Sequence, residues 1–172
     1  MSLRITGGMA RGRVLRGTLP NGVRPTSSRV REAWFSILGN DLTGLQFLDA
    51  YAGSGIMGFE AWSRGASSVL CVENRIGVAR QIRENSDLLG ANIQVKVGDA
   101  CRLSRGAFDL IFADPPYAKN PIPIIQALAT QQPMVLGIET RRGVVVADLP
   151  GAIRRTRSFG KTELHIYRWS QG

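Results

Sequence analysis

Apolar and polar positions along the chain follow two periods, which predict an alternating order of strands and helices. Short runs rich in Val, Ile, Leu and Phe predict five strands, at Leu45–Asp49, Ser68–Glu73, Ile93–Val97, Phe108–Asp114 and Val144–Asp148. Between them, apolar residues at helical spacing predict helices at Ile56–Arg64, Ile76–Leu89 and Ile122–Thr130. Such alternation predicts an α/β fold whose parallel strands are joined by right-handed crossovers. The segment 133–142 fits either a helix or a strand.

The two ends of the chain depart from this order. Residues 3–19 predict a short basic ribbon that turns at two glycines. An apolar stripe at helical spacing then predicts an amphipathic helix, formed by Val30, Ala33, Trp34, Ile37 and Leu38. The C-terminal part predicts a hairpin, at Ile153–Phe159 and Glu163–Trp169. We therefore expect a basic N-terminal hairpin in residues 1–25 and one α/β domain in residues 26–172.

The chain is organised around a strand, a glycine-rich loop and a helix at residues 45–60, LQFLDAYAGSGIMGFE. Gly53 and Gly55 allow a sharp turn and a close approach of the backbone to a ligand, as in nucleotide-binding βα units. Asp49, at the tip of the strand, would repel the pyrophosphate of a dinucleotide and attract a positively charged ligand. S-adenosylmethionine (SAM) fits this pattern, because it carries an ammonium and a sulfonium and its adenosine has no phosphate.

Four acidic residues lie at or just beyond the ends of four predicted strands: Asp49, Glu73, Asp99 and Asp114. Ligands of open parallel sheets bind at the carboxyl ends of the strands, so these acids are expected on one rim. Glu73 lies 20 residues after Gly53, where an acid commonly holds ribose hydroxyls. Asp99 can accept a hydrogen bond from an adenine amino group. Each acid taken singly also fits a strand end or a helix cap.

The sequence Asp114-Pro115-Pro116-Tyr117 is the sharpest chemical signal. Two prolines stiffen the turn and remove two backbone donors, which leaves carbonyl oxygens beside a carboxylate. Asp114 and the Pro115 carbonyl can accept the hydrogens of an exocyclic amine and hold its nitrogen toward a methyl donor. Tyr117 offers a flat face on which a base can stack. This turn predicts methylation of an amino group on a base.

Charge is distributed unevenly over the chain. The formal net charge is +9, and residues 1–31 contain seven Arg and no acidic residue. Residues 141–172 contain seven basic and two acidic residues, whereas residues 32–140 are net acidic. Arginine forks match phosphates and stack on bases, so the segregated charge favours a nucleic-acid partner.

Composition limits the class of protein. No apolar run approaches the roughly 20 residues of a membrane span, and the N-terminus has no signal-peptide pattern. Cys71 and Cys101 have no metal-ligand spacing, and no cluster predicts a metal site. His165, the one histidine, lies in a late predicted strand and is read as structural. We expect a cytoplasmic protein without a metal or a membrane partner.

These motifs resemble the class I SAM-dependent methyltransferases. The resemblance narrows to the RsmD family through three further stretches: RITGG with RGR near the start, RPTSSRVREAWF at residues 24–35, and FGKTEL at residues 159–164. It runs nearly end to end. The family usually has an acid at the end of its fifth strand, and on this reading Asp148 stands there.

The resemblance implies a Rossmann-like, seven-stranded, mostly parallel sheet with helices on both faces and an antiparallel last strand. It also implies methyl transfer from SAM to guanine N2 in 16S ribosomal RNA, with guanine 966 as the target and a monomeric enzyme acting on the RNA or on a small-subunit assembly particle. The candidate catalytic residues are Asp114, Pro115, Pro116 and Tyr117. The candidate cofactor-binding residues are Asp49, Tyr51, Ala52, Gly53, Gly55, Glu73, Asn74, Asp99 and Ala100. The candidate RNA-binding residues are Arg4, Arg11, Arg13, Arg24, Thr26 and Arg29.

Three alternative functions remain open on the sequence. The DPPY turn also fits an amino-methyltransferase that acts on DNA, on another RNA or on a small amine. A GxGxxG loop fits an NAD-dependent oxidoreductase, although Asp49 and the DPPY turn argue against it. A non-catalytic RNA-binding assembly factor would use the same arginine-rich arm without turnover.

Overall fold

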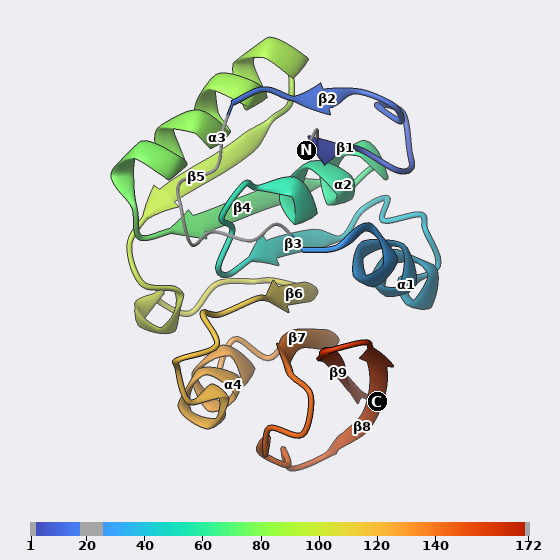
Figure 1. The fold of residues 1–172 in the computed structure, drawn as a ribbon, viewed down its shortest axis with the longest axis vertical. Coiled ribbons are helices and arrows are strands. Elements are labelled where there is room, and N and C mark those ends of the chain that lie inside the picture. Colours follow the sequence, from blue (N-terminus) through green and yellow to red (C-terminus); the bar gives the residue numbers. More distant parts are fainter. Residues whose placement is uncertain (1–2, 18–25, 171–172) are drawn as a thin grey trace.

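A seven-stranded, mostly parallel sheet forms the centre of the molecule (Figure 1). The computed structural model describes residues 3–17 and 26–170. The strands are β3 (Gln46–Asp49), β4 (Ser68–Glu73), β5 (Ile93–Val97), β6 (Leu110–Ala113), β7 (Val135–Arg141), β8 (Ala152–Phe159) and β9 (Thr162–Trp169), in the spatial order β5-β4-β3-β6-β7-β9-β8. The pairs among β3 to β7 are parallel, and β9 is antiparallel to both β7 and β8. The predicted sheet with its antiparallel last strand is confirmed.

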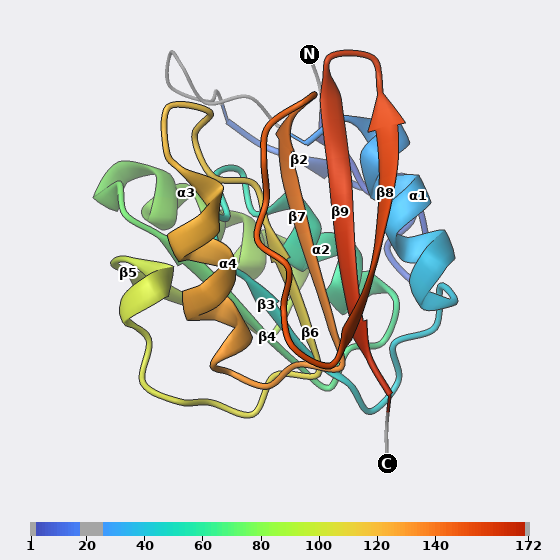
Figure 2. The same ribbon diagram turned by 90° about the horizontal axis from the view of Figure 1, so that it is seen from below.

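Helices cover both faces of this sheet. The helices are α1 (Ser28–Leu38), α2 (Ile56–Ser63), α3 (Ile76–Leu89) and α4 (Pro121–Ala129), with a 3₁₀ turn, η1 (Ala100–Arg102). Apolar residues of α1, α2 and α3 belong to one buried cluster, and those of α4 and η1 belong to another. Figure 2 accordingly shows α1 and α4 on opposite sides of the strands. None of the helices within residues 3–17 and 26–170 is long and apolar enough to span a membrane.

Local sequence explains where these helices begin and end. The Ser27 side chain accepts a hydrogen bond from the Val30 N–H, which satisfies one free donor of α1. Gly39 ends α1 with a φ of 104°, a conformation that glycine adopts without steric cost. The Asn120 side chain caps α4 in the same way as Ser27, and Pro121 occupies the first helical position.

The structure corrects the predicted fifth strand. The strand is Val135–Arg141, whereas residues 144–148 are irregular. Val135–Arg141 pairs with strands on both sides and is buried up to its last residue, as a central strand requires. Gly143 turns the chain with a φ of 80°, and Val145 beyond it is 76% exposed. The valine run is therefore a loop, of which Val146 packs into the same cluster as α4. The acid on the fifth strand of the sheet is Glu139, not Asp148.

The N-terminal ribbon forms a short hairpin that is packed onto the domain. Its strands are β1 (Leu3–Arg4) and β2 (Val14–Leu15), paired antiparallel. A terminal ribbon outside the main sheet would be expected to add little to the core, but this one is part of it. Ile5 and Leu15 are buried in the same cluster as α1 and α2, and the Met9 N–H donates to the carbonyl of Ser63 on α2 at 2.7 Å.

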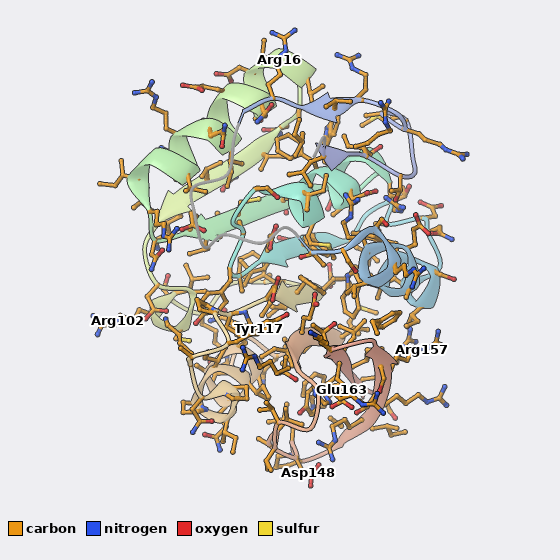
Figure 3. The ribbon with its side chains drawn as sticks, in the orientation of Figure 1. Arg16, Arg102, Tyr117, Asp148, Arg157 and Glu163 are labelled. Atoms are coloured by element: carbon orange, nitrogen blue, oxygen red, sulfur yellow. The ribbon has the colours of Figure 1, made fainter. Side chains whose placement is uncertain are left out.

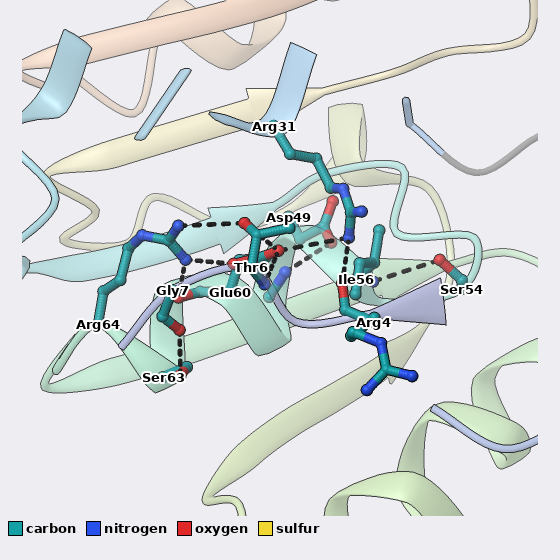
Figure 4. A network of polar contacts seen from close by, with 11 residues as sticks. Arg4, Thr6, Gly7, Arg31, Asp49, Ser54, Ile56, Glu60, Ser63 and Arg64 are labelled. Atoms are coloured by element: carbon teal, nitrogen blue, oxygen red, sulfur yellow. Dashed lines mark hydrogen bonds and ion pairs between the residues drawn. The ribbon is translucent and has the colours of Figure 1, made fainter. Parts of the chain in front are cut away.

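A buried ion cluster centred on Glu60 fastens the hairpin to α1 and α2 (Figure 4). Glu60 Oε1 accepts hydrogen bonds from the Thr6 N–H and Thr6 hydroxyl, both at 2.9 Å, and from Arg31 Nη1 at 3.3 Å. Glu60 Oε2 accepts a bond from Arg64 Nη1. Arg31 is 5% exposed, and burial lowers its pKa. The cluster joins three segments that are far apart in sequence.

Candidate functional site

A cleft opens at the carboxyl ends of β3, β4 and β6, where the strand order reverses direction. Open α/β sheets bind ligands at this position. Residues from the glycine loop, from the end of β4, from the DPPY turn and from the segment before α1 line the cleft: Thr26, Tyr51, Ala52, Gly53, Ser54, Glu73, Asn74, Arg75, Asp114, Pro115, Pro116, Tyr117 and Lys119. The structure thus brings the predicted cofactor loop and the predicted catalytic turn to one cavity.

The glycine loop is shaped by backbone conformation and by close helix packing. Gly53 and Gly55 have φ values of 52° and 76°, in the left-handed region that favours glycine. A Cβ at Gly58 would lie 2.5 Å from the Sγ of Cys71, so α2 approaches β4 as closely as a glycine permits. The carboxylate of Glu73 accepts hydrogen bonds from the N–H groups of Gly53 and Arg75, each at 2.9 Å. Glu73 therefore fixes the loop while it faces the cleft.

Four predicted cofactor residues are not part of the cleft lining. Asp49 is 1% exposed, and Gly55 and Ala100 are also buried. Asp99 is exposed, but its Oδ1 accepts a hydrogen bond from the Cys101 N–H and caps η1. A direct contact between these four residues and a ligand stays a prediction.

Asp49 is a buried acid with one hydrogen bond. Its Oδ2 accepts from the Gly58 N–H at 3.1 Å. Burial raises the pKa of Asp49 to about 7, the Gly58 bond opposes this shift, and the charge of Glu73 adds to it. Near neutral pH the Asp49 side chain thus sits close to its protonation midpoint.

We expect Asp49→Asn to flatten the dependence of stability on pH. The folded-state pKa of Asp49 lies above the unfolded value of 3.8, so the folded protein binds more protons between those values. Its contribution to stability is therefore full below about pH 4 and is lost as pH rises through about 7, by an amount on the order of 2–4 kcal/mol. Urea unfolding of wild type and variant from pH 4 to pH 8 measures this. If the free energy of unfolding depends on pH in the same way in both proteins, the raised pKa of Asp49 is contradicted.

The carboxyl group of Asp114 lies at the cleft between protein groups that alter its protonation. The Thr26 hydroxyl lies 3.5 Å from Asp114 Oδ2, which links the segment before α1 to the DPPY turn. Burial raises the pKa of Asp114 well above its ordinary value, and the charges of Glu139 and then Asp49 raise it further, while Thr26 opposes them. Asp114 is therefore a stronger base than an exposed aspartate.

Two tyrosine rings at the cleft each carry a cation over one face. Lys119 Nζ lies 5.3 Å from the ring centroid of Tyr51, and Arg141 Cζ lies 5.4 Å from that of Tyr117. Tyr117 is 38% exposed and is seen near the middle of the molecule in Figure 3. Five residues at or near the cleft were not predicted as site residues: Ser54, Arg75, Lys119, Arg141 and Glu139. Ser54, Arg75 and Lys119 lie within or close to the predicted motifs.

The predicted RNA-binding residues lie on three segments. Arg11 and Arg13 are exposed on the N-terminal hairpin, and Arg29 is exposed on the first turn of α1. Arg4 is exposed too, although its Nη1 donates a hydrogen bond to the carbonyl of Gly12. Thr26 is buried at the cleft, and Arg24 lies outside the described residues. The exposed arginines thus lie on the hairpin and on α1, and their contact with RNA stays a prediction.

His165 has a structural environment. It is 3% exposed, its Nε2 lies 3.0 Å from the Thr140 hydroxyl, and its Nδ1 lies 2.9 Å from the Thr156 hydroxyl. Both ring nitrogens thus bond to neighbouring strands away from the cleft lining. Across the part of the chain that the structure describes, no group of three or more His, Cys, Asp or Glu residues is placed to hold a metal ion.

Comparison with known proteins gives one consistent result. The sequence model of the family described as Conserved hypothetical protein 95 matches residues 3–168. Ribosomal RNA small subunit methyltransferase D of Escherichia coli K12 is 30% identical over 182 residues, which cover 99% of this chain and 92% of that protein. The protein of the same name from Haemophilus influenzae is 36% identical over 126 residues, covering 69% and 65% of the two chains.

Solved structures share the fold. The structure of Escherichia coli yhhF superposes with a TM-score of 0.85 at 30% identity and covers 99% of this chain and 100% of its own. An RNA methyltransferase from Salinibacter ruber, solved with S-adenosyl-L-homocysteine, has a TM-score of 0.64 at 16% identity over 85% of this chain and 92% of its own, which shows a shared fold. The family match spans nearly the whole chain, and the chain therefore belongs to this family, the RsmD family that its motifs resemble.

Proposed function

We propose that this protein transfers a methyl group from SAM to the exocyclic N2 amine of a guanine in small-subunit ribosomal RNA, with guanine 966 of 16S RNA as the target. The observation that carries the proposal is the single cleft shared by the glycine loop and the DPPY turn. A cofactor on the loop and an amine at the turn would meet there. The relatives named ribosomal RNA small subunit methyltransferase D support the substrate class.

The residues of the cleft fit SAM. The left-handed glycine at position 53 allows close approach of the loop, and Glu73 at the end of β4 can accept hydrogen bonds from ribose hydroxyls. Tyr51 and Asn74 add polar groups and a ring to the same wall. When bound, SAM supplies a methyl group on a sulfonium; the sulfur–carbon bond breaks with its electron pair left on sulfur as the nitrogen–carbon bond forms.

The DPPY turn would orient the acceptor and take its proton. The lone pair of guanine N2 is delocalised into the ring, so hydrogen bonds from the amine to Asp114 and to the Pro115 carbonyl would hold the nitrogen for attack. The amine gains positive charge as it is methylated, which the Asp114 carboxylate stabilises before it takes one proton. Tyr117 would stack on the extruded base. Positioning of this kind can contribute roughly 7–11 kcal/mol to catalysis.

Mass spectrometry of ribosomal RNA after incubation with protein and SAM tests this proposal. The RNA should come from cells that lack the modification, both as naked 16S RNA and as assembled small subunits. We expect a mass increase of one methyl group on a single guanine, mapped by nuclease fragments. Transfer to DNA alone would favour an amino-methyltransferase of another class, and RNA binding without turnover would favour an assembly factor. A ribosomal RNA substrate would place the protein in the cytoplasm.

We expect Arg11→Ala with Arg13→Ala to weaken RNA binding and leave SAM binding unchanged. Both side chains are exposed on a hairpin that is anchored by its buried residues, so their loss removes charge without removing packing. Each lost phosphate contact should reduce the slope of log affinity against log salt by roughly 0.7–0.9. Filter binding of a 16S fragment at several salt concentrations measures the slope.

A second double variant, at two exposed arginines near the C-terminus, distinguishes the contributions of the two basic ends of the chain to RNA binding. Arg155→Ala with Arg157→Ala removes the same charge from β8, an edge strand of the sheet. If this second variant flattens the salt slope and the hairpin variant does not, the phosphate clamp lies on the C-terminal hairpin. Unfolding of the Arg11/Arg13 variant would show instead that these arginines are structural.

A further inference from the structure

A buried glutamate, Glu139, lies on β7 at the position beside Asp114. The parallel register pairs Ala113 of β6 with Ile138 of β7, so Asp114 and Glu139 are the next residues along two adjacent strands. Paired positions of neighbouring strands direct their side chains to the same face of a sheet. Glu139 is 5% exposed and does not line the cleft. It therefore lies behind the DPPY carboxylate without contacting the space that a substrate would fill.

One oxygen of this glutamate lacks a bonding partner. Among the described residues, no group forms a hydrogen bond with Glu139 Oε2, which is buried. The Thr162 side chain forms a hydrogen bond with the Glu139 carboxyl group. An ionised carboxylate with an unpaired buried oxygen is costly. A proton held between Glu139 and a neighbouring acceptor would remove that cost.

Among the described residues, the groups that pack against the two acids from β3, β9 and α1 offer no compensating positive charge, and Arg141, two residues after Glu139 on β7, lies over the Tyr117 ring. Asp49 of β3 faces Asp114 on the side away from β7, and Thr26 approaches it from the segment before α1. Beside Glu139, β9 contributes Thr162 and Leu164, which are neutral. From α1, which covers this face, the buried guanidinium of Arg31 is bound to Glu60, and Arg29 and Glu32 are exposed.

We propose that Glu139 shares one proton with Asp114 and so sets the protonation state in which Asp114 meets the acceptor amine. Two carboxyl groups at paired positions of adjacent strands in a buried site do not both ionise readily, and they titrate as a pair. Burial raises the pKa of both groups, and the charge of Glu139 raises that of Asp114 further. Glu139 is a positioning residue, since it acts through Asp114.

This pairing deepens the proposed function, on which its catalytic meaning rests. In the transfer, N2 gains a methyl group and gives one N–H proton to the Asp114 carboxylate, which becomes a carboxylic acid. A neighbouring Glu139 makes Asp114 a stronger base at neutral pH, and it offers a second oxygen to which the proton can pass. The proton leaves to solvent when the methylated base departs.

The pair can be tested without any RNA. Carbon-13 NMR of the side-chain carboxyl groups follows the titration of Asp114 in the free protein, with Asp114→Asn used to assign its signal. In Glu139→Gln the like charge is gone and an amide N–H can donate to Asp114. We expect the midpoint of Asp114 to fall by about one to three pH units in that variant. An unchanged midpoint would overturn the proposal.

A neighbouring glutamate provides the control. Glu163 of β9 bonds to the Gly143 N–H at 3.1 Å and to the Ser158 hydroxyl at 3.2 Å, and it is not paired with Asp114. Glu163→Gln should leave the Asp114 midpoint where it is; an equal shift would show a general charge effect and overturn the pairing. If Glu139→Gln does not fold, the titration of Glu139 in Asp114→Asn tests the pairing. The pairing requires the midpoint of Glu139 to lie at lower pH in that variant than in the wild type.

Kinetics separate this inference from the proposed function. With a 16S fragment as acceptor, single-turnover rates should rise with pH as Asp114 loses its proton. In Glu139→Gln the rise should move to lower pH, and the plateau should fall because Asp114 is a weaker base. A shifted NMR midpoint in a protein that methylates no RNA would reject the proposed function and keep the pair. Normal methylation with an unshifted midpoint and pH profile would reject the pair alone.

Discussion

Asp114→Asn is expected to lower the single-turnover rate of methyl transfer by about 10²- to 10⁴-fold, the usual contribution of a positioned acid or base. Asparagine keeps the shape of the side chain, and its amide oxygen can still accept one hydrogen bond from an amine. It cannot take a proton, and it offers no negative charge to the developing cation. Rapid-quench assays with labelled SAM and a 16S fragment measure the rate.

Two further measurements on Asp114→Asn distinguish a loss of catalysis from a loss of SAM binding or of folding. SAM affinity, measured by calorimetry, should stay within about twofold, because Asp114 faces the acceptor in the proposed geometry. Removing an acid whose burial raises its pKa should not destabilise the protein near pH 8, so a loss of activity there would not reflect unfolding. A variant that methylates RNA at the wild-type rate would exclude Asp114 as the base.

Glu60→Gln is expected to lower the free energy of unfolding by roughly 3–5 kcal/mol, the usual cost of breaking a buried ion pair from one side. The change leaves the guanidinium groups of Arg31 and Arg64 in the interior, each with a side chain that is 5% exposed, without the carboxylate that both contact. It also weakens the two bonds from Thr6, which hold the hairpin. Urea denaturation and amide exchange of the hairpin residues measure the two effects.

An exposed pair of the same chemistry is the matched control. Glu84 and Arg80 form an ion pair on α3 at 2.9 Å, with side chains that are 58% and 78% exposed. Glu84→Gln should cost at most about 0.5 kcal/mol, since surface pairs are screened by water. If the two variants cost the same, the Glu60 cluster does not hold the hairpin, and the apolar contacts of Ile5 and Leu15 do.

Local sequence signals predicted the order of elements well. Gly39 and Gly90 end helices where the sequence placed their ends, because glycine adopts the left-handed cap conformation. The β3–loop–α2 unit and the C-terminal hairpin also lie where predicted. The exception is the fifth strand, for which Val144–Asp148 was chosen over 133–142. Both segments are apolar enough for a strand, and only pairing with β6 and β9 selects Val135–Arg141.

The main residues of the cleft could be predicted because they belong to short motifs that are recognisable along the sequence. Glu73 ends a strand and Gly53 and Asp114 come after strands, and parallel strands carry their C-terminal residues to one edge. Burial was not predictable in the same way. Asp49 ends a strand as Glu73 does, yet the close approach of α2 at Gly58 covers it and leaves it 1% exposed.

By itself, the sequence determined the alternation of strands and helices, the loop and turn chemistry of the cleft, and the segregation of arginine to the two ends. These depend on residue type and spacing along the chain. Tertiary structure alone decided which charges are buried and with whom. Arg31 reads as one more surface arginine, but packing encloses it with Glu60; Glu139 reads as a polar break in an ambiguous segment, but strand register sets it beside Asp114. Such pairings join residues that are 25 or more positions apart, and the energy of a buried charge depends on neighbours that only the folded chain supplies.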